Sequence, residues 1–239
     1  MKCLDLSFPT PVDNLACDEA LLEAFESGAL GETLRFWESP SYFVVVGYGN
    51  SVATEVNAAA CESKGIPILR RCSGGGTVVQ GPGCLNYSLV LEAGETGPLS
   101  SINSANRFIM ERNRAALQTL LGREVSVRGY TDLALDGIKF SGNAQRRRKR
   151  SLLFHGALLL QFDLPLISEL LPMPSKQPDY RNNRRHEDFL CNLHVSSDAV
   201  KSALRQAWNA VEPLEQIPSE TIASLARDRY ANAEWNFKF

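Results

Sequence analysis

The stretch that decides the fold reads Arg70-Arg71-Cys72-Ser73-Gly74-Gly75-Gly76-Thr77-Val78-Val79-Gln80-Gly81-Pro82-Gly83. Its arginines and glycines separate two apolar runs, 66–69 and 77–79, that are typical of strands. Glycine allows positive φ and lets a ligand lie against the main chain, at an entropic cost of about 0.5–1 kcal/mol per residue relative to alanine. Either arginine would offer a planar guanidinium to a carboxylate or a phosphate. We therefore predict an anion-binding loop; the alternative is a bulged sheet edge at which glycine relieves strain.

The composition is that of an ordinary globular protein. The 239 residues, 44% apolar and 22% charged, suit a single domain over 1–239 with its core in about 28–215. A net charge of −2 gives no reason to expect binding to nucleic acid or to an anionic membrane. No apolar run is long enough to cross a bilayer, and the early acid Asp5 argues against a signal peptide. The cysteines form no CxxC pair and the histidines have no zinc-ligand spacing, so we expect a reduced, cytoplasmic protein without zinc.

Hydrophobic periodicity predicts strands in the middle of the chain and helices around them. We expect strands at 2–8, 33–37, 42–46, 66–69, 77–79, 85–91, 125–127, 133–135, 138–145 and 152–162. We expect helices at 14–27 with Asp13 as the cap, and at 56–64, 101–121, 165–171, 197–211 and 219–230. The polar residues 175–188 indicate a mobile loop. The fold class is therefore α+β, with a mixed or antiparallel central sheet flanked by helices.

A second informative stretch reads Lys139-Phe140-Ser141-Gly142-Asn143-Ala144-Gln145-Arg146, shortly after Asp132-Leu133. Lys139 alternates with the apolar residues Ile138 and Phe140, so its side chain projects from the face opposite the core. Small residues follow at 141–144, where a second close approach to the backbone would fit. Taken alone, Lys139 would be a solvated strand lysine and His155 a hydrogen-bonded core histidine.

Taken together and in this order, four segments resemble the motifs of the lipoate–protein ligase A family, part of the biotin and lipoate ligase superfamily. They are 70–76, Asp132-Leu133, 139–146 and His155-Gly156. Residues 229–235 also resemble the segment that closes the catalytic domain of that family. The resemblance covers nearly the whole chain and implies an enzyme with a biotin/lipoate ligase-like catalytic domain.

The resemblance implies ATP-dependent activation of lipoate or octanoate to the acyl-adenylate, with Mg²⁺. Transfer to a lysine of a small acidic lipoyl carrier domain would follow. In this interpretation Lys139 is the catalytic residue, bridging the lipoate carboxyl and the α-phosphate, and Asp132 is a ligand of Mg²⁺. An apolar tunnel along the sheet takes the acyl chain. The implied substrate- and nucleotide-binding residues are Arg71, Ser73, Gly74, Gly75, Gly76, Thr77, Asn86, Asp132, Lys139, Ser141, Gly142, Asn143, Ala144, His155 and Gly156.

The chain departs from the family pattern in three ways. Thr77 replaces an alanine, and Gln80-Gly81 replaces a His-Asp pair. The asparagine expected directly after Gly83 is displaced to Asn86. The full ligases also carry a small C-terminal accessory domain, and this chain ends where that domain would begin. The resemblance therefore implies that ATP-driven activation involves a separate accessory-domain subunit or is missing.

Two other functions remain open. An octanoyl or lipoyl transferase would move the acyl group between carrier proteins through a cysteine thioester, without ATP. Related transferases carry that cysteine shortly before the segment that matches Asp132-Leu133, and residues 123–127 contain none. We interpret Cys72 and Cys84, near the glycine run, as packing residues. A non-catalytic module that binds lipoyl carriers is disfavoured by the presence of Lys139 and Arg71.

The run Arg146-Arg147-Arg148-Lys149-Arg150 is predicted to form the tip of a hairpin. Because one end of the run adjoins the second motif, we interpret it as a docking surface for an acidic carrier domain. The alternative is an ordinary solvated turn.

Overall fold

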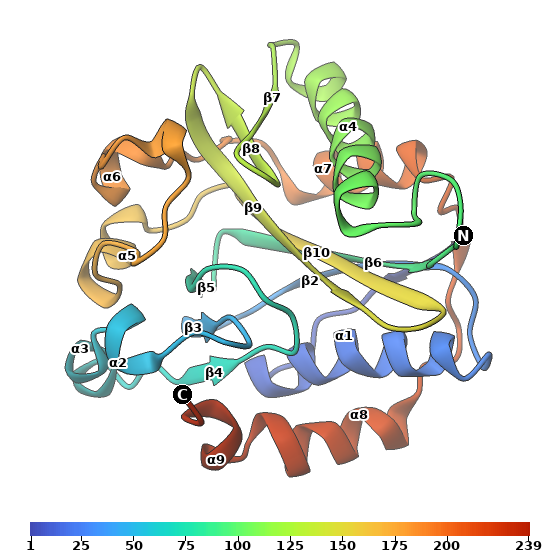
Figure 1. Cartoon of the computed structure of the whole chain (residues 1–239), viewed down its shortest axis with the longest axis horizontal. Helices are drawn as coiled ribbons and strands as arrows, with labels where there is room; N and C mark the ends of the chain where they lie inside the picture. The colour runs from blue at the N-terminus through green and yellow to red at the C-terminus, as the bar shows by residue number, and fades with distance from the viewer.

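The computed structural model describes residues 1–239 and contains two sheets (Figure 1). The large sheet has eight strands in the order β11-β1-β2-β6-β10-β9-β8-β7. Their bounds are Glu212–Pro213, Lys2–Asp5, Thr33–Glu38, Cys84–Glu92, Ser151–Leu159, Ile138–Arg147, Asp132–Leu135 and Ser126–Arg128. The small sheet has the order β4-β3-β5, with bounds Ile68–Arg70, Phe43–Val46 and Val78–Gln80.

Both sheets mix parallel and antiparallel pairs. β1 runs parallel to β2 and β11, whereas β2, β6, β10, β9, β8 and β7 pair antiparallel in turn. In the small sheet, β3 pairs parallel with β4 and antiparallel with β5. The predicted α+β class with a mixed sheet is therefore confirmed.

Helices cover both faces of the large sheet. α4 (Ile102–Leu121) and α7 (Ser197–Ala207) lie together on one side, and α1 (Pro11–Glu26) and α8 (Ser219–Leu225) on the other (Figure 1). The first side holds a core that includes Leu34, Phe36, Leu89, Ile109 and Leu204. The second core joins α1 to both sheets, since Leu21, Trp37, Phe43 and Val45 belong to one cluster. The two sheets therefore pack against each other beside α1.

The helix predicted at 14–27 begins three residues earlier. Thr10 is the cap, because its Oγ accepts a hydrogen bond from the Asp13 amide at 3.1 Å and Pro11 occupies the first helical turn. Asp13 therefore lies inside the helix and is not the cap that we expected. The helix is buried on nearly every side. It carries a buried ion pair to the large sheet, with Asp18 Oδ1 2.6 Å from Arg35 Nη1.

Two predicted segments are organised differently. The helix predicted at 56–64 is α3, which is shorter (Ala58–Ser63) because the side chain of Asn57 caps it, and a separate short helix, α2 (Val52–Glu55), precedes it. The segment 175–188, predicted as a loop, is largely irregular but also contains a 3₁₀ turn, η1 (Asp179–Arg181), and the start of α6 (His186–Phe189). Arg181 is buried, and its guanidinium carbon lies 4.7 Å from the centroid of the Phe189 ring. The polar sequence of this segment did not indicate that burial.

The other predicted elements are present with ends shifted by a few residues. α5 covers Leu164–Leu170, and the last predicted helix becomes α8 followed by a π-helical turn, η2 (Ala226–Tyr230). A short helix, α9 (Ala233–Asn236), then packs beside β4. None of the helices is both long and apolar enough to span a bilayer.

Candidate active site

A cavity of about 460 Å³, here called the central cavity, lies between the two sheets. Its walls come from the loop after β4, from β5, β9 and β10, and from residues 174–190. Most of the predicted site residues line it: Arg71, Gly75, Gly76, Thr77, Asp132, Lys139, Ser141, Gly142, Asn143, Ala144, His155 and Gly156. Ser73, Gly74 and Asn86 do not. The fold therefore brings together motifs that lie far apart in the sequence.

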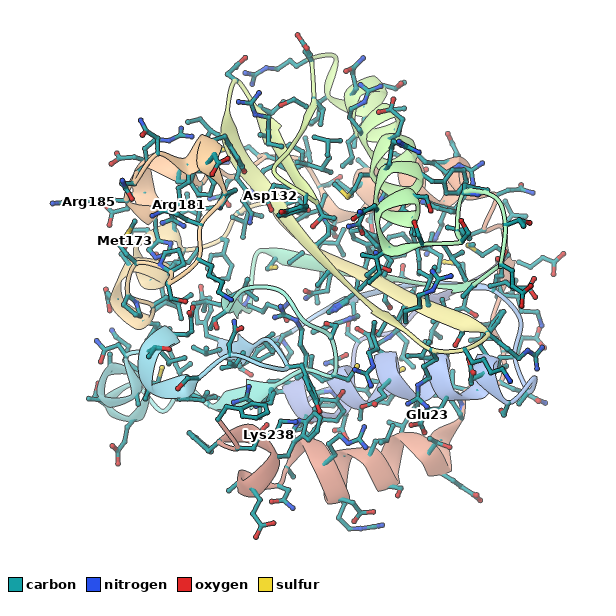
Figure 2. The ribbon with its side chains drawn as sticks, viewed as in Figure 1. Glu23, Asp132, Met173, Arg181, Arg185 and Lys238 are labelled. Atoms are coloured by element: carbon teal, nitrogen blue, oxygen red, sulfur yellow. The ribbon has the colours of Figure 1, made fainter.

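Lys139 and Asp132 form an ion pair at the wall of the central cavity. Lys139 Nζ lies 2.8 Å from Asp132 Oδ1, and the Tyr180 hydroxyl donates to Asp132 Oδ2 at 2.8 Å. Figure 2 shows Asp132 beside β9 and Arg181, the neighbour of Tyr180, on the adjoining segment. A Cβ at Gly142 would lie 2.8 Å from Lys139 Nζ. Glycine at this position therefore lets the lysine lie across its own strand.

The glycine loop, residues 71–77, has one glycine that the fold requires and two that it does not. Gly75 has a φ of +87°, and a Cβ there would lie 2.9 Å from Arg71 Nη2. At Gly74 and Gly76 a Cβ would meet nothing within 4 Å, and all three glycines are exposed. Relief of backbone strain therefore explains Gly75 alone. The bare main chain at Gly74 and Gly76 is what a ligand lying on the backbone needs.

The two arginines beside this loop have different partners. Arg71 donates from Nε to Ser73 Oγ at 3.1 Å, and from Nη2 to the carbonyls of Gly74 at 2.6 Å and Gly76 at 2.7 Å. Burial lowers the pKa of Arg71 to about 10, so it stays protonated at neutral pH. Arg70 is fully buried, and its guanidinium donates only to main-chain carbonyls, those of Gly47, Tyr48, Asn50, Trp235 and Asn236. Only Arg71 therefore lies at the cavity, where it orders the glycine loop.

His155 joins β10 to the glycine loop. Its Nε2 lies 2.5 Å from Ser73 Oγ. Burial and the charge of Arg71 lower the pKa of His155 to about 4, so the imidazole is neutral at pH 7. Ser73 thus contacts two residues of the cavity wall, His155 and Arg71, but does not line the cavity itself.

Asn143 and Gly156, which line the cavity, also meet on the face of the large sheet that carries Tyr87. The Tyr87 hydroxyl donates to Asn143 Oδ1 at 2.5 Å, passing across Gly156, where a Cβ would lie 1.7 Å from that oxygen. Asn143 Nδ2 also donates to the Thr131 carbonyl at 2.6 Å. The hydrogen bonds of Asn143 are therefore internal ones that hold the chain leading into Asp132.

Sequence reasoning missed two groups of residues at the site. The turn at 47–50 packs on the glycine loop: a Cβ at Gly47 would lie 2.1 Å from the Gly75 carbonyl oxygen, and Asn50 Nδ2 donates to that oxygen at 3.1 Å. The other group is Tyr180 with its neighbours on residues 174–190. The Gly-Tyr-Gly-Asn pattern signalled a turn, and nothing in the sequence showed what the turn would contact.

No cysteine lines the central cavity. All six are unpaired, and five of them are buried. Burial raises the pKa of the Cys72 and Cys84 thiols to about 12, which opposes thiolate formation. The half-buried Cys191 also has a raised pKa because of burial. The structure contains no group of three or more metal-ligating side chains, and Asp132 is the single acidic residue lining the cavity.

Comparison with known proteins agrees with this geometry. An octanoyltransferase LipM of Geobacillus kaustophilus is 26% identical over 274 residues, covering 99% of this chain and 98% of the relative. A crystal structure of a lipoate-protein ligase A bound with ATP has a TM-score of 0.83 and 28% identity, covering 99% of this chain and 98% of that one. A bipartite lipoate protein ligase from Thermoplasma acidophilum, described with its E2 lipoyl domain, has a TM-score of 0.81 and 26% identity, covering 99% and 95%.

These likenesses confirm the resemblance drawn from the four motifs and extend over the whole fold. The family described as the lipoyl protein ligase A/B catalytic domain matches residues 10–209, which include all the residues of the central cavity. The chain therefore belongs to the lipoyl protein ligase A/B catalytic domain family, as an enzyme of the lipoate ligase and octanoyltransferase group.

Proposed function

We propose that the protein is an ATP-dependent lipoate–protein ligase, which makes lipoyl-AMP and transfers the lipoyl group to a lysine of a lipoyl carrier domain. The observation that carries this proposal is the pair of Lys139 and Asp132 at a cavity without a thiol. A transferase that works through a thioester needs a nucleophilic cysteine at the acyl site. Adenylate formation needs a cation beside the reacting oxygens and an open backbone for phosphate, which Lys139 and the exposed main chain at Gly74 and Gly76 would supply.

In the first half-reaction a lipoate carboxylate oxygen attacks the α-phosphorus of ATP, and the bond to the departing pyrophosphate breaks. Lys139 Nζ would leave Asp132 and donate to the carboxylate and to the α-phosphate oxygens, where it stabilises the charge that develops in transfer. The exposed main chain at Gly74 and Gly76 and the Thr77 hydroxyl would hold phosphate oxygens. In the second half-reaction the carrier's lysine amine attacks the acyl carbonyl, and AMP leaves.

Asp132 fits the role of protein ligand to magnesium. Magnesium usually takes one or two protein carboxylates together with phosphate oxygens and water, so a lone aspartate at a nucleotide site is sufficient. Both oxygens of Asp132 bond to other groups, to Lys139 and to Tyr180, so Lys139 would be released when the nucleotide binds. The metal would neutralise phosphate charge; Tyr180 would keep the carboxylate oriented.

The apolar part of the central cavity would hold the acyl chain. Leu15, Trp37, Val45, Val79 and Leu159 line it, and they belong to both sheets and to α1. Burial of an eight-carbon chain here would contribute about 0.8 kcal/mol per methylene group.

An octanoyltransferase is the second candidate function. The LipM relative, which matches the chain almost from end to end, favours this alternative. The lining of the cavity favours the ligase, because the transferase would have to use one of the buried, high-pKa thiols. The two candidates share the acyl cavity and the carrier but differ in their need for ATP.

We propose two protein partners. One is a small acidic lipoyl carrier domain, because the Thermoplasma relative is described with its E2 lipoyl domain. The other is a separate accessory subunit that completes activation, because that same relative is bipartite.

The test is to incubate the protein with ATP, Mg²⁺, lipoate and an apo carrier domain and to measure the carrier's mass. A parallel reaction omits ATP and supplies an octanoyl carrier as the donor. Carrier acylation that requires ATP, or pyrophosphate release from ATP and lipoate, supports the ligase. Transfer without ATP, with an acyl group trapped on a cysteine, establishes the transferase.

A further inference from the structure

One row of residues crosses four strands of the large sheet beneath the central cavity. Trp37 on β2 pairs with Asn86 on β6, Asn86 pairs with Ala157 on β10, and Ala157 pairs with Gly142 on β9. Directly paired residues of antiparallel strands project from the same face. Trp37, Ala157 and Gly142 all line the cavity, and Lys139 Nζ lies above Gly142. The row therefore begins under Lys139, the proposed catalytic residue, and ends at the large ring of Trp37. Its first two positions, Gly142 and Ala157, have almost no side chain.

Asn86 is the exceptional member of this row. It is 2% exposed, and neither Oδ1 nor Nδ2 of its side chain has a hydrogen-bond partner in the protein. Buried polar groups in folded proteins are nearly always paired, and an unpaired one destabilises the fold. An amide kept in this position without a partner is a sign of a ligand that supplies one.

A second unpaired amide lies at the same end of the cavity. Gln80 lines the cavity and its Oε1 is buried without a partner. Gln80 pairs with Phe43 across β5 and β3, and the Phe43 ring stacks on Trp37 with centroids 6.4 Å apart. The small sheet thus adds a polar group to the end that Trp37 closes. Asn86 and Gln80 are here called the amide pair.

The spacing of the strands sets the distance between Lys139 and the amide pair. Neighbouring strands lie about 4.8 Å apart, so Asn86, two strands from Gly142, is about 10 Å along the row. With carbon–carbon bonds of about 1.5 Å, an extended eight-carbon acid spans about 9 Å. An acid whose carboxylate meets Lys139 therefore places its sixth to eighth carbons at Asn86. In octanoate those carbons carry only hydrogen, whereas in lipoate carbons six and eight carry the two ring sulfurs.

We propose that Asn86, assisted by Gln80, selects lipoate over octanoate by pairing with the dithiolane sulfurs. Divalent sulfur is a weak acceptor. Asn86 lies between two lining residues, Trp37 and Ala157, but beneath the cavity lining itself, so its side chain would turn toward the cavity when lipoate binds and donate from Nδ2 to a sulfur. The alkyl end of octanoate would leave the amide unpaired, which costs binding energy that lipoate does not lose. Trp37 ends the tunnel behind the ring. This inference rests on the proposed function, because it assumes that the acyl chain lies in the central cavity with its carboxylate at Lys139.

The experiment compares lipoate and octanoate on the wild type, Asn86→Leu and Gln80→Leu. The wild type should prefer lipoate, and Asn86→Leu should reduce the ratio of the two kcat/KM values by about fivefold. Gln80→Leu should have the same effect to a smaller degree. The matched control is Ser88→Ala: Ser88 lies on the same face of β6 and donates to Asp18 at 2.8 Å, outside the cavity lining. It should leave the ratio unchanged.

Direct binding of each free acid, measured by calorimetry without ATP or carrier, separates this inference from the proposed function. A lipoate preference in binding by a protein that makes no adenylate would support the amide pair while overturning the ligase. Equal binding of both acids by the wild type, or an unchanged ratio in Asn86→Leu, would overturn the inference even if the ligase is active. The melting temperature of Asn86→Leu should not fall, since the substitution removes an unpaired amide; a fall with an unchanged ratio would show a structural role only.

Discussion

The hydroxyl of Ser73 lies 2.5 Å from Nε2 of His155 and joins the glycine loop to β10. Arg71 approaches the same hydroxyl, with its Nε 3.1 Å away. Burial of the ring and, to a smaller extent, this cation lower the pKa of His155 to about 4. The contact therefore depends on a neutral imidazole, because an imidazolium would be repelled by Arg71.

The first prediction concerns pH and stability. Since the folded-state pKa of His155 is about 4, below the ordinary 6.5, the unfolded chain binds this proton first as the pH falls. The stability that neutral His155 contributes is present above about pH 6.5 and is lost as the pH falls toward 4. The melting temperature of the wild type should drop by a few degrees over this interval, and by less in His155→Gln. His194→Asn, at an exposed position with positive φ, is the control and should behave as the wild type. If the melting temperatures of the wild type, His155→Gln and His194→Asn all fall by the same amount, His155 is not the group responsible.

The second prediction concerns Lys139. Lys139→Ala removes the cation that pairs with Asp132 at the cavity wall, and no core volume is lost. Adenylate formation, measured as pyrophosphate release, should fall at least about a hundredfold, as for loss of one donor to a developing oxyanion. Lys64→Ala, which breaks a surface pair with Glu169, should leave the rate unchanged. A wild-type rate in Lys139→Ala would exclude the catalytic role.

The third prediction separates two glycines of the loop. Gly76→Val should block substrate binding with little change in melting temperature, because a Cβ there meets nothing within 4 Å. Gly75→Val should unfold more easily, since a side chain at φ +87° costs about 1–2 kcal/mol. Calorimetry of unfolding, and of binding of ATP and of lipoate, would check both. Full binding by Gly76→Val would show that no ligand lies on this backbone.

The Lys139 and glycine motifs were predictable from the sequence, because each is a local pattern whose strand and loop residues determine their own geometry. The choice between Arg70 and Arg71 was not, since it depends on carbonyls of Trp235 and Asn236 at the far end of the chain. Tyr180 was missed for a similar reason. Its segment is polar, and it is ordered by contacts such as Arg181 against Phe189 and the hydrogen bond to Asp132, which no periodicity reveals.

The fourth prediction concerns the thiols. Cys72→Ala and Cys84→Ala, singly and together, should keep substantial ATP-dependent transfer, because both thiols are buried away from the central cavity with pKa values raised to about 12. Cys191→Ala should behave in the same way. Carrier acylation with and without ATP would be measured for each variant. An acyl-thioester trapped at any of these positions, with turnover independent of ATP, would establish the transferase.

The basic run at 146–150 is divided by the structure into residues that hold the fold and residues that face solvent. β9 extends to Arg147, whose Nη2 donates to the Leu99 carbonyl at 2.7 Å. Arg148 pairs with Glu23 at 3.0 Å, and Figure 2 shows Glu23 on α1, below this hairpin. Reversing the charge of either arginine would therefore disturb packing as well as any docking. Lys149, at the exposed turn, is the residue that tests docking alone.

The last prediction is that Lys149→Glu raises the KM for the carrier domain several-fold at low ionic strength and much less at 0.15 M salt and above. Charges near a docking site steer an acidic partner, and salt screens them over about 8–10 Å. Adenylate formation from free lipoate should be unchanged, because that half-reaction does not involve the carrier. Lys64→Glu, the same charge reversal at another partly exposed lysine that is paired with Glu169, is the control for net charge. If both variants shift the KM equally, the effect belongs to overall charge; if neither does at low salt, the run is a solvated turn and the carrier docks elsewhere.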